Sequence, residues 1–373
     1  MSEPMNKDIG QSKPHALSEH IKTKLVEADF GLLGKIVLDN PKALNALSTD
    51  MIEAMQATLD AWADDDHIKA VWIEGAGEKA FCAGGDVVML YHSMQETAAG
   101  DVPVKAQEFF TKEYKLDQTI HHYAKPVIVY ADGIVMGGGL GVAVGGSHRI
   151  VTERSMIAMP EVTIGLYPDV GASWFFNRMP GQCAEFLGMT GARMNAADAL
   201  FTKLADFAVA TDELAAMQLA ILESDGTHDG ITTAIQSAQM EQRVHESQLW
   251  VNYELINELM APVDLSDVVQ QFKDLETDDK WLSFAAKALV NGCPMTLHLV
   301  REQIRRAKHM SLSEVFEMEI NMSTQCAMNP DLAEGIRALL IDKDGQPKWS
   351  ADSVSEITAE QIETFFQQPQ LNN

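Results

Sequence analysis

Short apolar runs alternate with helical patterns over the first 210 residues of the chain. The apolar runs predict strands over 24–28, 35–38, 70–73, 127–130, 149–152 and 156–159. Apolar residues at helical spacing predict helices over 48–64, 103–123 and 140–146, the first of them with Ser48 as its N-cap. Strands that alternate with helices along a chain are typical of an α/β fold.

The pattern changes after about residue 211, where helical periodicity dominates to the end. Helices are predicted over 212–224, 248–260, 296–308, 312–328 and 359–367. Ser311 and Glu314 form a capping-box signal at the start of one of them. We therefore predict a flexible N-terminal tail over 1–22, an α/β core over 23–225 and a helical C-terminal region over 226–373.

The composition narrows the classes of function. The 373 residues carry a net charge of −26, which argues against a nucleic-acid or anionic-membrane partner, because phosphate groups attract basic surfaces. No apolar run reaches the length of a membrane span, and the polar N-terminus lacks the apolar segment of a signal peptide. We therefore expect a cytoplasmic protein, or a mature chain that has already been trimmed. The four cysteines form no C-x-x-C pair and predict neither disulfides nor a metal site. They are Cys82, Cys183, Cys293 and Cys326.

Two glycine-rich turns, predicted over 78–86 and 131–141, are the candidate chemistry of the chain. Gly137–Gly139 follows an apolar run and precedes a predicted helix, so its backbone N–H groups are uncovered and lie at a positive helix end. Such a turn binds an anion, or it merely lets a helix pack closely on a sheet. Neither phosphate-binding motif is present. The dinucleotide-binding pattern needs a glycine where this chain has Val142, and the P-loop pattern needs a lysine where it has Ser147. The interpretation that remains is an oxyanion hole, to which this turn and the second turn, Ala83–Gly85, each contribute backbone N–H groups.

Two acids follow soon after, Glu161 behind Pro160 and Asp169 behind Pro168. Taken separately, Asp169 suits a helix N-cap and Glu161 suits a solvated loop. Beside two anion-binding turns, a carboxylate that activates water or attacks a carbonyl becomes the better interpretation.

Several segments together resemble the crotonase (enoyl-CoA hydratase/isomerase) superfamily. They are the stretches 40–47, 80–86, 136–139 and 159–171, the pair Glu113-Tyr114 after Phe110, and the tail 335–349. The resemblance covers almost the whole chain after the N-terminal tail. It implies an α/β (α+β) fold: a crotonase-like spiral of ββα units in two sheets, with a helical C-terminal region.

The chain departs from a hydratase at two positions. Hydratases of this superfamily carry a glutamate at the position of Gly141 and a second one at the position of Glu161. This chain keeps the glutamate at Glu161 but has glycine at Gly141. It also has an acid at Asp169, where hydratases usually have glycine. The pair needed to add water to an alkene is therefore broken. The chain looks most like the branch that hydrolyses 3-hydroxyisobutyryl-CoA, or a close β-hydroxyacyl-CoA, in valine degradation.

The resemblance also implies roles for individual residues. The carbonyl of the thioester would lie between the N–H groups of Gly85 and Gly138. Glu161 would be the main catalytic carboxylate, as nucleophile or as general base, and Asp169 would orient the water or the substrate hydroxyl. The implied substrate-binding residues are Glu113, Lys42, Ala43, Leu44 and Ala83. Arg301, Arg305 and Arg306 either contact the CoA phosphates or form a solvated helix face.

Two other functions stay open at this point: an enoyl-CoA hydratase or isomerase, and a non-catalytic acyl-CoA-binding member of the fold. The resemblance implies an acyl-CoA as partner and allows a homo-oligomer. It implies no metal and no cofactor other than the coenzyme A of the substrate.

Overall fold

The computed structural model of the chain describes residues 18–98, 100–239 and 246–369. Its strands are β1 (Ile21–Ala28), β2 (Gly31–Leu38), β3 (Ile68–Gly75), β4 (Ala80–Cys82), β5 (Val127–Ala131), β6 (Ile134–Met136), β7 (His148–Val151), β8 (Met156–Ala158) and β9 (Phe207–Ala208). The predicted tail over 1–22 falls mostly outside the described residues, and β1 already begins at Ile21.

The larger sheet has six strands in the order β1-β2-β3-β5-β7-β9. β1 and β2 are antiparallel, and the other neighbours are parallel. β5 is buried along its whole length. Parallel strands that are covered on both faces are continuously apolar, which is why the run over 127–130 predicts this strand correctly.

The smaller sheet has three parallel strands in the order β4-β6-β8. Each of its strands follows a strand of the larger sheet along the chain: β4 follows β3, β6 follows β5, and β8 follows β7. The chain thus repeats pairs of strands followed by helices. The prediction of simple turns over 78–86 and 131–141 is wrong for β4 and β6, because three-residue strands are too short to show a periodicity.

The helices outnumber the predicted ones. In the first part they are α1 (Thr49–Ala63), α2 (Val87–Glu96), α3 (Val104–His121), α4 (Gly138–Gly145), α5 (Ala172–Phe176), α6 (Cys183–Thr190) and α7 (Ala196–Phe201). They continue with α8 (Leu214–Leu222), α9 (His228–Gln236), α10 (Gln248–Val251), α11 (Tyr253–Leu259), α12 (Leu265–Lys273), α13 (Lys280–Asn291), α14 (Pro294–Ala307), α15 (Leu312–Met328), α16 (Pro330–Ile336) and α17 (Ala359–Thr364). The capping box of Ser311 and Glu314 at the start of α15 is confirmed.

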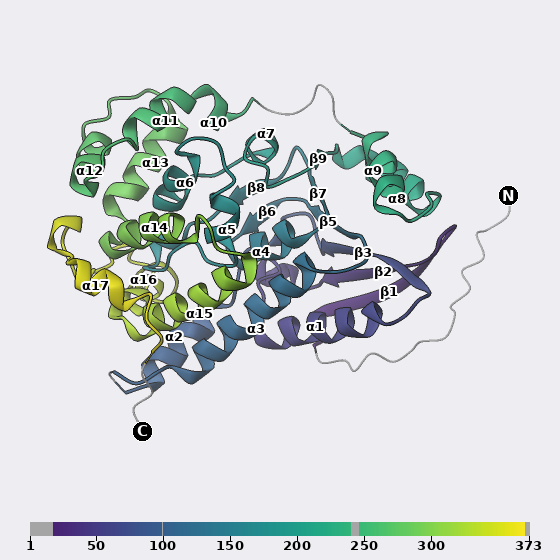
Figure 1. Cartoon of the computed structure of the whole chain (residues 1–373), viewed down its shortest axis with the longest axis horizontal. Coiled ribbons are helices and arrows are strands. Elements are labelled where there is room, and N and C mark those ends of the chain that lie inside the picture. Colours follow the sequence, from purple (N-terminus) through teal and green to yellow (C-terminus); the bar gives the residue numbers. More distant parts are fainter. Residues whose placement is uncertain (1–17, 99, 240–245, 370–373) are drawn as a thin grey trace.

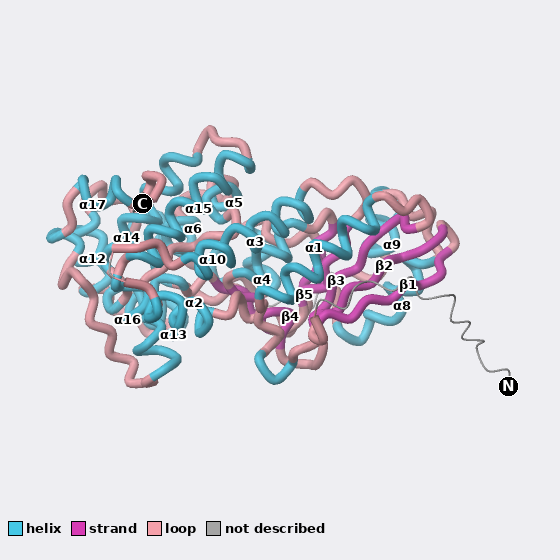
Figure 2. Tube along the Cα trace, turned by 90° about the horizontal axis from the view of Figure 1, so that it is seen from below, coloured by secondary structure: helices cyan, strands magenta, loops and turns pink. Residues whose placement is uncertain are grey.

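The two faces of the larger sheet are covered by different helices (Figure 1). Val71 and Ile73 of β3 point into the main core with α1 and α3, whereas Trp72 points into a second cluster with α8 and α9. Figure 2 shows the helices α12–α17 gathered at one end of the molecule and the larger sheet at the other. The boundary near residue 225 stays a prediction.

Candidate active site

The two glycine-rich turns meet at one point of the molecule. One turn joins β4 to α2 and carries Gly84 and Gly85; the other joins β6 to α4 and carries Gly137 and Gly138. A Cβ atom placed on Gly138 would lie 3.4 Å from Gly85 N, and one placed on Gly84 would lie 3.7 Å from Gly138 N. Neither the Gly85 nor the Gly138 amide N–H has an acceptor within the described part of the chain. Two free N–H donors therefore lie side by side, as an oxyanion hole requires.

Glycine is needed here for both conformation and space. Gly84 has φ +109° and Gly137 has φ +49°, in the range that other residues rarely adopt. A Cβ on Gly138 would overlap Glu113 Oε1, and one on Gly137 would lie 3.0 Å from Glu161 Oε1. Two carboxyl groups thus pack directly against the turn that carries the N–H groups.

Three buried acids surround these turns. Glu113 on α3 is 3% exposed, Glu161 in the short helix Glu161–Thr163 is 5% exposed, and Asp169 in the loop before α5 is 4% exposed. Within the described residues, Glu113 Oε1 and Glu161 Oε2 have no hydrogen-bond partner. Their burial rules out a merely solvated loop for Glu161, and the N-cap of α5 is Gly171, not Asp169.

Burial raises the pKa of all three acids. The pKa of Glu113 is raised well above its usual value by burial and by the charge of Asp169. The pKa of Glu161 is also raised well above its usual value, by burial and by the charges of Asp169 and Glu113. Burial also raises the pKa of Asp169, to about 6, although the hydrogen bond that Tyr114 donates lowers it. Each of the three acids thus holds its proton more tightly than a solvent-exposed carboxyl group does.

A chain of hydrogen bonds connects Asp169 to α15. Tyr114 Oη donates to Asp169 Oδ2 at 2.6 Å and lies 2.5 Å from Ser323 Oγ. Tyr167 Oη lies 2.8 Å from the same Ser323 Oγ. Glu319 Oε2 accepts from Gly171 N at 2.7 Å and so holds the loop after Asp169. Sequence patterns did not predict the contacts of Ser323 and Glu319, because no local pattern links these residues to partners that lie 148 to 209 positions earlier.

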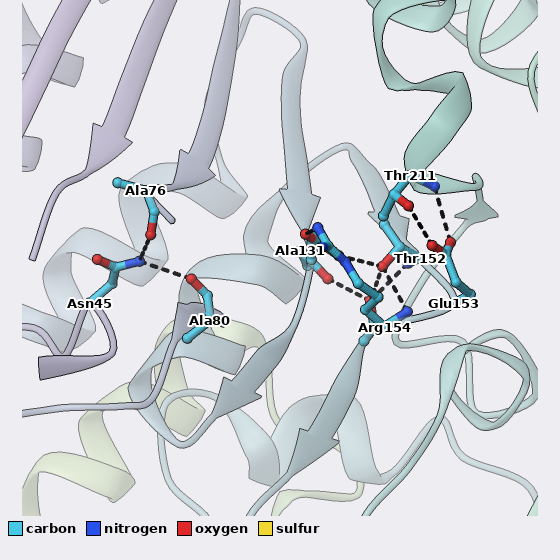
Figure 3. Close-up of polar contacts among 10 residues, drawn as sticks. Asn45, Ala76, Ala80, Ala131, Thr152, Glu153, Arg154 and Thr211 are labelled. Carbon is cyan, nitrogen blue, oxygen red and sulfur yellow. Dashed lines mark hydrogen bonds and ion pairs between the residues drawn. The ribbon is translucent and has the colours of Figure 1, made fainter. Parts of the chain in front are cut away.

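The loop over 40–47 is held against the turn after β3. The side-chain amide of Asn45 donates to Ala76 O at 2.9 Å and to Ala80 O at 2.8 Å (Figure 3). Ala83 N donates to Leu44 O at 3.0 Å, and Leu47 N donates to Gly84 O at 2.8 Å. These bonds fix the loop and the first glycine turn as one unit.

The proposed binding residues of this loop lie at the edge of the site. Lys42 and Ala43 are exposed, and Leu44 and Ala83 are half-buried next to each other. Lys42 is thus free to meet an anionic ligand outside the buried acids. The three arginines of α14 are already engaged: Arg301 pairs with Glu185, Arg305 with Glu302, and Arg306 with Glu302 and Glu363. These ion pairs favour the solvated-face interpretation over phosphate contacts.

Gly141 lies one helical turn behind this site. A Cβ on Gly141 would lie 2.7 Å from Asp117 Oδ2 and 2.7 Å from Val170 Cβ. Asp117 was not singled out by sequence reasoning, although it lies four residues after Glu113 and therefore on the same face of α3. The space beside Gly141 is thus occupied by a carboxyl group of another helix.

Two further features of the described residues concern metal ions and membranes. No group of three or more histidine, cysteine or acidic side chains there is arranged to hold a metal ion. Among the same residues, no helix has the length and apolarity needed to cross a bilayer.

The model of the enoyl-CoA hydratase/isomerase family matches residues 33–366. The chain is 35% identical over 348 residues to the mitochondrial 3-hydroxyisobutyryl-CoA hydrolase of Gallus gallus, which covers 92% of this chain and 88% of that protein. The human protein of the same name is 32% identical over 338 residues, with 90% and 86% covered. The chain therefore belongs to the enoyl-CoA hydratase/isomerase family, as its motifs suggested.

Solved structures give the same fold. A carnitinyl-CoA dehydratase from Mycobacterium thermoresistibile matches with a TM-score of 0.84 and 34% identity, covering 95% of this chain and 99% of that one. An enoyl-CoA hydratase from Rhodobacter sphaeroides matches with a TM-score of 0.81 and 30% identity, covering 93% and 97%. The expected crotonase fold is confirmed. The expected cytoplasmic location gains no support, since the named hydrolases are mitochondrial.

Proposed function

We propose that this chain hydrolyses a short β-hydroxyacyl-CoA thioester, with 3-hydroxyisobutyryl-CoA as the preferred substrate, to the free acid and coenzyme A. The observation that carries the proposal is the meeting of two free N–H groups with the buried acids Glu113 and Glu161, with Asp169 near enough for its charge to raise the pKa of both. The names of the relatives at 32–35% identity agree with it.

The N–H groups of Gly85 and Gly138 would bind the thioester oxygen. As the carbonyl carbon becomes tetrahedral, its oxygen becomes an anion, and both donors are already in place to receive it. Removing one such donor typically costs a hundredfold to a thousandfold in rate. Gly138 is buried, so bulk water weakens its hydrogen bond little, whereas Gly85 is half-buried.

Glu161 lies against the second glycine turn and is the proposed catalytic carboxylate. Either it attacks the carbonyl carbon and expels the CoA thiolate, leaving an anhydride that water then opens, or it takes a proton from the attacking water. Both routes require ionised Glu161, and its raised pKa makes the ionised form a stronger base and nucleophile. Asp169 orients the water or the substrate hydroxyl.

Hydration of an enoyl-CoA is the second candidate, because two similar solved structures are named as a dehydratase and a hydratase. Against it stands Gly141, which supplies no acid from α4 to pair with Glu161 across an alkene. The remaining alternative, an inactive acyl-CoA-binding protein, does not explain why Glu113 and Glu161 are buried here, each with a carboxyl oxygen that has no hydrogen-bond partner among the described residues. A free carboxyl buried without a partner is costly unless it serves a function.

The test is release of free thiol from a panel of acyl-CoA thioesters, with crotonyl-CoA hydration followed in parallel. We expect the highest kcat/KM with 3-hydroxyisobutyryl-CoA, and losses of at least about a hundredfold in Glu161→Gln and Asp169→Asn. Glu108→Gln, an exposed acid on α3, is the matched control and should keep full activity. Full activity in both site variants would refute the mechanism. Rapid hydration of crotonyl-CoA without thiol release would refute the proposed reaction.

The coenzyme A of the substrate would enter beside Lys42, and no other cofactor takes part in the proposal. The place in valine degradation and assembly into a homo-oligomer belong to the proposal as well. Measuring the activity on the acyl panel and the mass of the protein in solution tests these two points separately.

A further inference from the structure

A small cavity lies one helical turn behind the catalytic groups. Its inner wall is formed by Asp117, Gly141 and Val170. Asp117 lies one helical turn after Glu113, Gly141 lies one turn after Gly138, and Val170 directly follows Asp169. The cavity leaves about 20 Å³ for the centres of water molecules. Since about 10–15 Å³ is enough for one water molecule, it has room for water.

Asp117 is the unusual group in this cavity. Its side chain is 2% exposed, and neither carboxyl oxygen has a hydrogen-bond partner among the described residues. A buried carboxyl group without partners costs free energy, unless water or a proton satisfies it. Burial and the charges of nearby acids raise its pKa well above the usual value, which favours its protonated form.

The cavity extends from this buried acid to the surface. Its outer wall includes His121, Arg149 and Trp174, which are all half-exposed. The guanidinium of Arg149 pairs with Asp206 at 2.6 Å, so it does not neutralise Asp117. The titratable and charged groups around Asp117 are Glu113, Asp169 and Glu319 towards the active site, and His121 and Arg149 in the cavity.

Thioester hydrolysis creates a need for such a path. Water adds to the carbonyl carbon, a C–O bond forms and the C–S bond breaks. Near neutral pH the products are a carboxylate, a thiol and one proton. On the proposed function, bound acyl-CoA would cover the front of the site, and this proton would be left among buried acids.

We propose that the rear cavity holds water and that Asp117 passes protons between this water and Glu113. Glu113 and Asp117 are four residues apart on α3, where side chains are neighbours, roughly 5–6 Å apart at Cβ. Asp117 accepts a proton on one oxygen and releases the proton of the other oxygen to the cavity water, so its own charge is unchanged. Its role during turnover rests on the proposed function, whereas its access to water does not.

The first test uses the resting protein and needs no substrate. The infrared difference between the wild type and Asp117→Asn should contain the C=O band of a protonated carboxyl group at neutral pH. That band should shift within seconds of transfer to D₂O, because the cavity water exchanges with solvent. A missing band, or a band that stays unshifted for hours, would overturn the proposal even if the protein proves to have another activity.

The second test is kinetic. In Asp117→Asn we expect kcat to fall about a hundredfold with little change in KM, and formate to restore part of the rate by replacing the proton carrier. The melting temperature should not fall, since Asp117 makes no hydrogen bond that the amide would lose. Glu108→Gln is again the control on the same helix. Wild-type kcat in Asp117→Asn would refute the role of Asp117 while leaving the hydrolase proposal intact.

A third variant keeps Asp117 and fills the space around it. Val144 lines the same cavity, so Val144→Ile should slow the deuterium shift of the Asp117 band and lower kcat. Deuterium exchange as fast as in the wild type would show that this cavity is not the route of the water.

Discussion

Replacing Asp169 by asparagine should stabilise the protein while it removes activity. Burial raises the pKa of Asp169 from 3.8 to about 6, so the folded chain holds this proton more tightly than the unfolded chain does. For such a carboxyl group, the stability of the folded state is highest at a pH below the pKa of the group in the unfolded chain. It falls as the pH rises towards the pKa of the group in the folded chain, because the folded structure disfavours the charged form. The difference of about 2 pKa units corresponds to about 3 kcal/mol, lost between about pH 4 and pH 6.

The asparagine side chain in Asp169→Asn does not ionise between pH 4 and pH 6, so the variant does not lose this stability. Its amide oxygen can still accept the hydrogen bond that Tyr114 donates to Asp169, so the local contact is kept. We therefore expect the variant to gain about 3 kcal/mol relative to the wild type between pH 4 and pH 6, and to keep this gain above pH 6.

Urea unfolding of both proteins at pH 4, 5, 6 and 7 measures this difference, and thiol release measures the activity of the same samples. Glu108→Gln serves as the control, because its side chain is exposed and its stability difference should not follow this pH course. A difference between Asp169→Asn and the wild type that stays constant with pH would refute the reasoning. It would mean that the folded structure does not disfavour the charge on Asp169.

Three other substitutions test separate parts of the site. Tyr114→Phe removes the hydrogen bond that lowers the pKa of Asp169, so the loss of stability that accompanies ionisation of Asp169 should shift to higher pH in urea unfolding; an unchanged pH course contradicts this. Gly138→Ala puts a methyl group onto Glu113 Oε1 and should lower kcat at least about a hundredfold in a protein that stays folded by circular dichroism. Asn45→Ala loses the hydrogen bonds that its side chain donates to Ala76 O and Ala80 O and the one that it accepts from Asn40 N, so the free energy of unfolding should fall by about 2 kcal/mol and KM should rise more than kcat falls; unchanged urea unfolding would count against it.

The sequence predicted the parts of the site that local patterns encode. The apolar run at β5 and the glycines at 84–85 and 137–139 each have a local signature, and both turns lie where a strand ends and a helix begins or soon follows. Glu161 and Asp169 could be singled out because they follow prolines in a loop next to these turns, although their roles stay predictions.

The parts that the sequence did not predict depend on tertiary packing. Ser323 reaches Tyr114 and Tyr167 only because α15 packs against α3. Periodicity marks Ser323 as a residue of a helix, but it does not say which residue of another helix it will meet. The same holds for Asp117, whose importance comes from Gly141 and Val170 beside it and not from its own sequence context.

The position of Asp117 also changes what the missing glutamate at Gly141 means. If that position were merely empty, Gly141→Glu would be enough to rebuild the pair of acids that a hydratase uses. The structure argues otherwise, because a Cβ at Gly141 would lie 2.7 Å from both Asp117 Oδ2 and Val170 Cβ. A side chain at Gly141 would require the carboxyl group of Asp117 to turn away and the loop that carries Asp169 and Val170 to move. Hydration is therefore disfavoured by the packing around Gly141 as well as by the loss of one residue, and the same packing leaves the carboxyl group of Asp117 beside the rear cavity.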